Sequence, residues 1–182
     1  MEYNNPSEII KDLAFGMHAR DRIMQGVEKL ASAVESTLGA SGKCVIYEDA
    51  MGKPVITKDG VTVAESVVLL NPVENIGATL IKEAAKKTVR EAGDGTTTAT
   101  VLAHSLLQEM NATNDYTVRQ IKDSMSSGLE KVLKYLNKKS IHIKGEMLED
   151  VASISCNNDK KLGKIIADAY NCLLYTSDAA DE

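Results

Sequence analysis

The sequence predicts a mostly helical fold that contains one small antiparallel β hairpin. Apolar residues recur at the three- and four-residue spacing of amphipathic helices over most of residues 20–136, and β-branched runs interrupt them only between residues 44 and 63. The core must be aliphatic, because aromatic residues make up only 4% of the 182 residues and tryptophan is absent. With 43% hydrophobic and 26% charged residues, the composition excludes a disordered tail, a collagen-like fibre and a disulfide scaffold.

The first helix is predicted to begin at Arg20 and to end at Gly39, because residues 1–14 are polar and glycine commonly follows a helix. Its apolar face consists of Ile23, Val27, Leu30, Val34 and Leu38, at steps of four, three, four and four residues.

Three short strands are expected next, at 44–48, 55–57 and 61–63. The last two are joined by Lys58, Asp59 and Gly60. An Asp-Gly pair between β-branched runs is a strong hairpin signal, because glycine adopts positive φ without strain. Taken alone, this hairpin tip is an ordinary solvated turn.

The remaining helices follow the punctuation at Asn71-Pro72. The second runs to Gly93-Asp94-Gly95, the third begins within Thr96–Thr98, and a polar loop at 111–115 precedes the fourth. Their apolar faces consist of Ile76, Leu80, Ile81, Ala84, Ala85, Thr88 and Val89; of Val101, Leu102, Leu106 and Met110; and of Ile121, Met125, Leu129, Val132, Leu133 and Leu136. We expect the four helices to pack against one another through these faces. Two shorter helices are predicted around 147–154 and from Leu162, the last ending where residues 172–182 begin.

Charge and cysteine usage narrow the function classes. The net charge of −5 argues against a protein that binds nucleic acid through its charge. No apolar run is long enough to span a membrane, and none follows Met1 as a secretory signal would. Cys44, Cys156 and Cys172 lack the spacing of a metal site or a disulfide framework, which indicates reduced thiols and a cytoplasmic location.

The residues of the last stretch, from Cys172 to Glu182, by themselves indicate an unusual origin. It matches the translation of a transposon-library sequencing adapter over consecutive codons, and both edges of the match are in frame. The match predicts that 171–182 is an adapter-derived tail and that the biological sequence ends near Tyr170. We therefore expect the chain to be a truncated read of something longer.

The segment from Gly93 to Thr100 carries the strongest chemical signal. Glycines flank Asp94, and Thr96, Thr97 and Thr98 then open a helix. A helix N-terminus with close glycines attracts phosphate, threonine hydroxyls add donors, and an aspartate suits such a site when Mg²⁺ lies between. The same residues also suit a plain helix stop followed by a threonine cap, and composition alone does not decide between the two.

Other candidate sites are weaker. The turn at 37–43 is not a P-loop, because its spacing is wrong, Cys44 replaces Ser or Thr, and a helix precedes it. His18, His104 and His142 have no partner at metal-ligand spacing and are taken as structural or surface residues.

Several motifs together resemble the group I chaperonins, the sixty-kilodalton heat-shock family. They are Thr37-Leu-Gly39, residues 56–64, residues 92–103, Phe15-Gly-x-x-Ala-Arg20, residues 154–159 and residues 163–167. The order matches over about residues 13–170, which favours the nucleotide-site interpretation of the Gly-Asp-Gly segment. The resemblance implies that 1–137 is the N-terminal half of an equatorial domain and that 138–170 begins an intermediate domain. The client-binding apical domain would lie beyond the chain.

The resemblance also implies ligands and roles. Nucleotide-binding positions would be Thr37, Leu38, Gly39, Ala40, Lys58, Asp59, Gly60, Asp94, Gly95, Thr96, Thr97, Thr98 and Ile154. Asp94 would bind Mg²⁺, while main-chain oxygens of Thr37 and Lys58, with Thr97, would bind K⁺. Asp59 would polarise the surroundings of the water molecule that attacks the phosphate. Ala40 departs from the family, in which proline is usual, and leaves that loop less rigid.

The implied function is that of a truncated subunit of an ATP-dependent protein-folding chaperonin. Its parent would form a double-ring homo-oligomer and would bind unfolded clients and a small co-chaperonin, with no nucleic-acid or membrane partner. The family's ribose-binding acid and second catalytic carboxylate are outside this chain, so we expect weak or undetectable Mg-ATP binding and no turnover. Two alternatives are a natural short module that joins or caps rings without ATPase activity, and an unrelated Asp-Thr nucleotide binder such as a small kinase.

Overall fold

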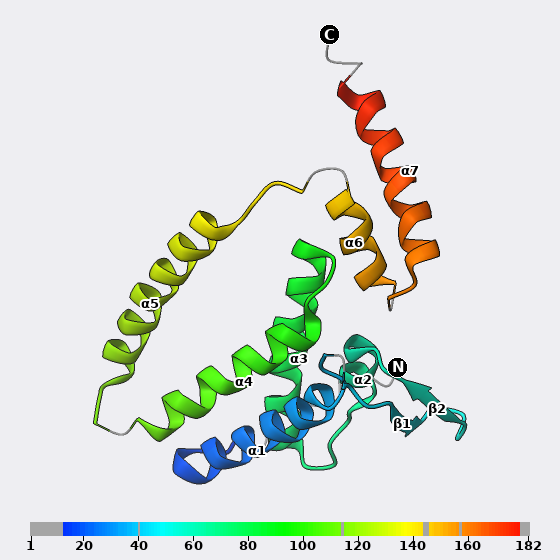
Figure 1. The fold of residues 1–182 in the computed structure, drawn as a ribbon. Helices are drawn as coiled ribbons and strands as arrows, with labels where there is room; N and C mark the ends of the chain where they lie inside the picture. Colours follow the sequence, from blue (N-terminus) through cyan, green and yellow to red (C-terminus); the bar gives the residue numbers. More distant parts are fainter. Residues whose placement is uncertain (1–12, 40, 114, 144–145, 157, 179–182) are drawn as a thin grey trace, which may run out of the picture. The chain divides into compact units, whose positions relative to one another are not determined.

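The computed structural model describes residues 13–39, 41–113, 115–143, 146–156 and 158–178, with backbone only for 174–178. Ala40 and the end of the adapter-like tail, 179–182, lie outside these residues. The elements are α1 (Gly16–Glu35), β1 (Val45–Glu48), β2 (Pro54–Thr57), α2 (Gly60–Ser66), α3 (Pro72–Ala92), α4 (Thr96–Ala112), α5 (Val118–Lys139), α6 (Glu146–Ser155) and α7 (Lys160–Asp178) (Figure 1). This mostly helical fold with a two-stranded antiparallel sheet confirms the predicted fold class. The chain divides into two compact units, one ending at Thr117 and the other beginning at Val118.

The core of the first unit lies where α1, α2 and α3 meet. It consists of Val27, Leu30, Val34, Val63, Ala64, Ala78 and Ile81, each at most 4% exposed. The α1 residues in it step by three and four, which confirms the centre of the predicted apolar face. Burying these aliphatic side chains removes them from water and is the main stabilisation available to a chain with few aromatics.

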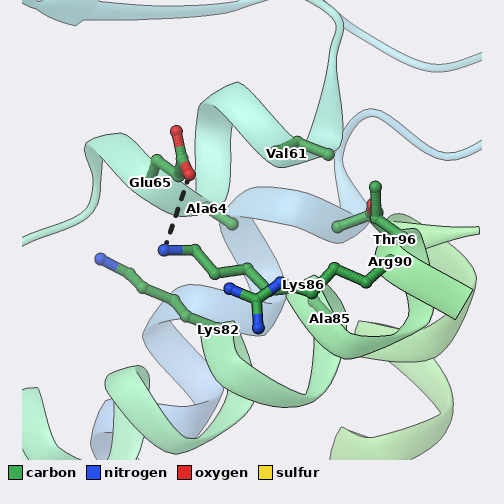
Figure 2. Close-up of a pocket in the computed structure, with 9 residues that line it drawn as sticks. Val61, Ala64, Glu65, Lys82, Ala85, Lys86, Arg90 and Thr96 are labelled. Carbon is green, nitrogen blue, oxygen red and sulfur yellow. Dashed lines mark ion pairs between the residues drawn. The ribbon is translucent and has the colours of Figure 1, made fainter. Parts of the chain in front are cut away.

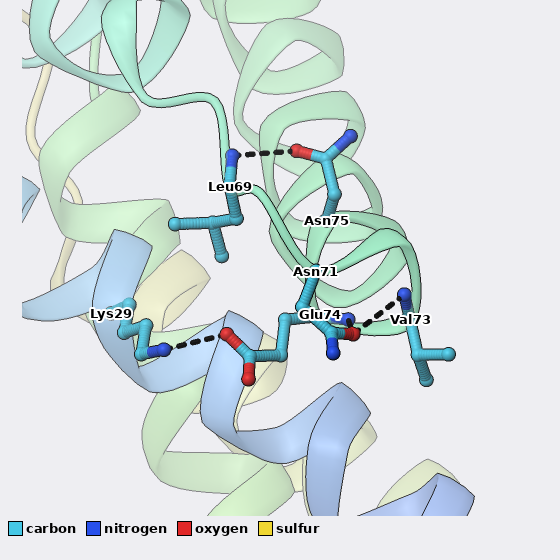
Figure 3. Close-up of polar contacts among 6 residues, drawn as sticks. All are labelled: Lys29, Leu69, Asn71, Val73, Glu74 and Asn75. Carbon is cyan, nitrogen blue, oxygen red and sulfur yellow. Dashed lines mark hydrogen bonds and ion pairs between the residues drawn. The ribbon is translucent and has the colours of Figure 1, made fainter.

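Glycines allow α1 and α3 to come unusually close. A Cβ built on Gly26 would lie less than 3.0 Å from the Glu74 carbonyl, and one on Gly77 less than 3.0 Å from the Ile23 carbonyl. The contact is reinforced where Lys29 Nζ donates to Glu74 Oε2 at 2.5 Å (Figure 3). Backbone-to-backbone packing at this crossing leaves no room for any side chain at either glycine.

The start of α3 is fixed by asparagines. The Asn71 side-chain oxygen accepts from the backbone N–H groups of Val73 at 3.0 Å and Glu74 at 3.2 Å, as an N-cap should. Asn75 Oδ1 accepts from the Leu69 N–H at 3.1 Å and ties down the incoming chain (Figure 3). The helix ends at Gly93, as predicted, with φ of 77°.

The hairpin differs from the prediction. β1 pairs with β2, placing Ile46 opposite Ile56, so the predicted partnership of 55–57 with 61–63 is wrong. The turn lies at 49–53, where Asp49 Oδ1 accepts from the Met51 and Lys53 N–H groups at 2.8 and 2.9 Å. Residues 61–63 belong to α2, because helical geometry buries Val63 and Ala64 in the core.

The α4 packing face also differs from the prediction. The buried residues of α4 are Thr96, Thr100 and His104, whereas Leu102 and Leu106 are at least half exposed. The Thr100 hydroxyl donates to the Thr96 carbonyl at 2.9 Å, so burial leaves this hydroxyl paired. Thr96, Thr100 and His104, together with the partly buried Ala103 and Leu107, therefore face the other helices of this unit.

In the second unit, α6 and α7 pack closely. A Cβ on Gly163 would lie less than 3.0 Å from Ser153, and Ala152, Ser153 and Ala167 are buried. α5 forms as predicted, and none of its residues is buried within the described chain; its expected packing against the helices of the first unit stays a prediction. Its apolar positions Leu129, Val132, Leu133 and Leu136 are 49–58% exposed. The last helix continues past the expected end, to Asp178.

Candidate functional site

The link between α3 and α4 is a tight reversal built from two glycines. Gly93 has φ of 77° and Gly95 has φ of 94°, a left-handed conformation that strains any residue with a Cβ. Asp94 lies between them, and its Oδ1 accepts from the Gly95 N–H at 2.6 Å. The reversal brings the Asp94 carboxylate to the N-terminus of α4.

The N-terminus of α4 is free to bind an anion. Gly95 is the N-cap and offers no side chain, so no side chain caps the helix. The first intrahelical bond runs from the Ala99 N–H to the Gly95 carbonyl at 2.8 Å, which leaves the preceding first-turn amides without intrahelical acceptors. These amides and the positive end of the helix dipole favour a negatively charged ligand.

A cavity of about 280 Å³ joins this turn to the start of α2. We call it the glycine–threonine cavity, and its lining consists of Asp59, Gly60, Val61, Val89, Gly93, Asp94, Gly95, Thr96, Thr97 and Thr98. The two halves touch, because a Cβ on Gly60 would lie less than 3.0 Å from the Thr97 hydroxyl. Two segments that are distant in the sequence, 59–61 and 93–98, thus share one wall.

Asp59 is the N-cap of α2 rather than part of a hairpin tip. Its Oδ2 accepts from the Thr62 N–H at 2.9 Å and from the Thr62 hydroxyl at 2.5 Å. Partial burial raises the pKa of the Asp59 carboxyl, but hydrogen bonds from the Thr62 hydroxyl and from the Thr62 and Val61 N–H groups outweigh burial and hold it below 3.8. Asp59 is therefore ionised at neutral pH beside the cavity.

The first predicted loop leaves α1 next to this cavity. The Thr37 hydroxyl donates to the Val34 carbonyl at 2.7 Å, and Val34 Cγ1 lies 3.5 Å from the Cβ position of Gly60. Gly39 has φ of 73°, which suits a glycine. The lining of the glycine–threonine cavity includes Asp59, Gly60 and Asp94–Thr98, and it does not include Thr37, Leu38, Gly39 or Lys58.

Ile154 lies in α6, in the second unit, and is 70% exposed. Its expected position near a nucleotide stays a prediction. Three residues that line the cavity were not picked out as site residues from the sequence: Val61, Val89 and Gly93. Gly93 could have been found, because it is the first glycine of the Gly-Asp-Gly turn. The two valines carry no such signal, since they look like ordinary apolar positions.

The residues present fit Mg²⁺ and a phosphate better than they fit K⁺. Mg²⁺ in phosphate sites usually takes one or two carboxylates together with phosphate oxygens, and Asp94 supplies a carboxylate beside uncapped amides. The proposed K⁺ ligands are not gathered in the same way, because Thr97 lines the cavity and Thr37 and Lys58 do not. The described residues contain no cluster of three or more His, Cys, Asp or Glu side chains that could hold a metal by themselves.

A sequence model of the TCP-1/cpn60 chaperonin family matches residues 30–181, most of the chain. The chain belongs to the TCP-1/cpn60 chaperonin family. Solved chaperonins share its fold. The chaperonin gp146 of bacteriophage EL 2 (Pseudomonas aeruginosa), determined in the presence of ATP-BeFx, aligns with a TM-score of 0.77 and 32% identity over 85% of this chain. A group III chaperonin in the open state aligns with a TM-score of 0.74 and 28% identity over 86% of it.

These alignments cover most of this chain but only a part of each solved chaperonin. This chain spans 28% of the phage chaperonin and 32% of the group III chaperonin. The chaperonin resemblance seen in the motifs is confirmed at the level of the family. Within the described residues, no helix combines the length and the apolarity needed to cross a membrane.

Proposed function

We propose that this chaperonin chain supplies the phosphate- and metal-binding half of an ATP site. The observation that carries the proposal is the glycine–threonine cavity, where Asp59 and Gly60 meet Asp94 and the uncapped N-terminus of α4. Few other ligands need a carboxylate, a row of hydroxyls and free helix amides in one wall. A phosphate chain with its metal needs all three.

Each part of the wall has a distinct task in this proposal. The amides and hydroxyls of Thr96, Thr97 and Thr98 bind phosphate oxygens, and the missing side chain at Gly95 lets the ligand approach the backbone. Asp94 holds Mg²⁺, which neutralises negative charge on the phosphates. A K⁺ ion held by Thr37, Lys58 and Thr97, and a contact from Ile154, extend the proposal on the strength of the motif resemblance.

Asp59 is the proposed catalytic carboxylate. It is ionised, it lies at the cavity, and the Thr62 N–H and hydroxyl both donate to its Oδ2. An oriented carboxylate of this kind can accept a hydrogen bond from water and so order it for attack on phosphorus. Hydrolysis needs further positioned groups and a closed site, and we propose that these come from parts of the parent protein outside this chain.

The parent's wider function is part of the same proposal. The phage relative was solved with an ATP analogue, and the present chain spans less than a third of it. We therefore propose a cytoplasmic, group I-like, ATP-driven folding chaperone for the parent, assembled as a double ring of identical subunits. Unfolded clients and a small co-chaperonin would bind through its other domains. The exposed apolar face of α5, which includes Leu129 and Leu133, is consistent with a chain that packs against further protein.

Amide hydrogen exchange with and without millimolar Mg-ATP tests the site directly. We expect slower exchange at the amides of residues 95–98, and loss of this protection in Asp94→Ala or when Mg²⁺ is chelated. Asp123→Ala, which removes an exposed carboxylate of α5, is the matched control and should keep the protection. Because this chain is expected to bind Mg-ATP weakly, amides at 95–98 that stay unprotected both in it and in a reconstructed parent would refute the site. A phosphate-release assay on the same chain should show no turnover, and robust turnover would favour the kinase-like alternative.

A further inference from the structure

A second cavity lies between α2 and α3, beside the glycine–threonine cavity. It measures about 280 Å³ and shares Val61, Val89 and Thr96 with that cavity. We call it the basic cavity, because its remaining lining includes three cations. The full remainder is Ala64, Glu65, Lys82, Ala85, Lys86 and Arg90.

The three cations share one face of α3. Lys82, Lys86 and Arg90 are four residues apart, so their side chains stack along the same side of the helix. Figure 2 shows their charged ends on the side of α3 that faces α2, with the Glu65 carboxylate reaching toward Lys86. Glu65 is the single acid in the lining, and its Oε1 lies 3.6 Å from Lys86 Nζ. One carboxylate therefore faces three cations.

Lys82 is partly buried, the Lys86 side chain is 39% exposed, and Arg90 lies at the exposed rim of the cavity. Lys82 Nζ donates to the Val67 carbonyl at the end of α2, which fixes its ammonium group near the cavity. Burial lowers the pKa of Lys82, the charge of Lys86 lowers it further, and Glu65 only partly compensates. Val61, Ala64 and Ala85 provide apolar walls, and such walls strengthen any charge interaction formed between them.

We propose that the basic cavity binds a phosphate-class oxyanion, separately from the phosphates proposed at the N-terminus of α4. A compact dianion would match the two unbalanced positive charges, and the planar Arg90 guanidinium can bind two of its oxygens at once. A small anion also fits better than an extended acidic peptide, because the cavity measures only about 280 Å³. The proposal does not rest on the ATP site.

Titration with inorganic phosphate, followed by isothermal calorimetry at constant ionic strength, tests the proposal. Removing a charge-assisted bond should weaken phosphate binding about tenfold in Arg90→Gln and in Lys86→Gln. Lys87→Gln is the matched control, because Lys87 lies on the same helix, outside the cavity, and pairs with Glu91 at 3.7 Å. Glu65→Gln should tighten binding several-fold, an effect that damage to the fold cannot imitate.

The variant Asp94→Ala separates the two sites. Phosphate binding should persist in it, even where Mg-ATP protection of 95–98 is lost. Competition by ATP in this variant would identify the ligand as a nucleotide phosphate, and lack of competition would identify the free anion. The proposal fails if the chain does not bind millimolar phosphate, or if Arg90→Gln and Glu65→Gln bind it as tightly as the unsubstituted chain does. It also fails if Asp94→Ala alone abolishes binding.

Discussion

Gly60 and Thr97 lie in direct contact where α2 and α4 begin. A Cβ on Gly60 would come within 3.0 Å of Thr97 Oγ1, closer than such atoms approach in real proteins, and would reach Val34 Cγ1 at 3.5 Å. The hydrogen side chain of Gly60 therefore sets the distance between the Asp59 and Asp94 walls of the glycine–threonine cavity. The geometry of the proposed ATP site depends on this one contact.

Gly60→Ala should destabilise the fold and disturb the cavity together. The new methyl group must displace the Thr97 side chain or separate α2 from α4, an overpacking cost of about 1–3 kcal/mol. Thr97→Ala removes the clashing oxygen, so Gly60→Ala/Thr97→Ala should recover most of the loss. Urea denaturation of the two single variants and the double variant measures the coupling. Additive changes in the free energy of unfolding would show that the two residues do not interact.

Asp59 has a structural task and a proposed catalytic task, and substitution can separate them. Asparagine is as good an N-cap as aspartate, so Asp59→Asn should keep the stability of α2, while Asp59→Ala should lose about 1 kcal/mol. In a reconstructed parent, both variants should lose ATP turnover, because asparagine carries no negative charge. Phosphate release and chemical denaturation are the two measurements. Turnover that survives in Asp59→Asn would leave Asp59 as a cap alone.

The lowered pKa of Asp59 predicts a pH dependence of stability. A carboxyl whose pKa is lower in the folded chain stabilises the fold above its unfolded pKa, and this contribution is lost as pH falls through the folded value. The hydrogen bonds from Thr62 hold that value below 3.8. The stability advantage of the unsubstituted chain over Asp59→Ala should therefore shrink as the pH is lowered from about 5 to about 3. Denaturation midpoints across this range test it, and a constant difference would contradict it.

The close crossing of α1 and α3 predicts that one added methyl group there will strongly destabilise the fold. Gly77→Ala places a methyl group against the Ile23 backbone, which cannot rotate away as a side chain can, so we expect a loss of more than about 2 kcal/mol. Gly128→Ala is the matched control, since it also lies inside a helix but has no heavy atom within 4 Å of its Cβ position. It should stabilise α5 by up to about 1 kcal/mol. Thermal denaturation compares the two, and equal effects would disprove the tight crossing.

The order of the helices could be predicted from the sequence, because apolar spacing and terminal glycines are local signals. Val61 and Val63 show where local signals fail. Their β-branching suggested a strand after Asp59-Gly60, yet the Asp59 cap and the burial of Val63 against α1 and α3 favour a helix. The Asp-x-x-Thr spacing of Asp59 and Thr62 was the available clue.

The site shows the same division between local and tertiary information. The Gly-Asp-Gly turn could be predicted, because only glycine suits its two left-handed positions. The inward face of α4 could not, because periodicity does not tell which face is buried, and here the smaller Thr96 and Thr100 pack where Leu102 was expected. Threonines at the start of α4 allow the close approach that the cavity needs, while Leu102 and Leu106 stay exposed and Leu107 packs against the core.

The buried Nε2 of His104, which is unpaired in the described part of the chain, predicts that replacing this imidazole with an apolar side chain will stabilise the fold. Its side chain is 8% exposed, and its Nε2 has no hydrogen-bond partner among the described residues. A buried, unpaired polar atom costs about 1–3 kcal/mol, so His104→Leu should raise the free energy of unfolding by about 1 kcal/mol or more. Gln108→Leu, one turn further along the same helix at an exposed position, controls for the helix propensity of leucine and should change stability by less than about 0.5 kcal/mol. Urea denaturation decides: if His104→Leu is less stable than the unsubstituted chain, the imidazole must have a partner that stabilises it, and Glu28, which lines the groove beside it, is the place to look.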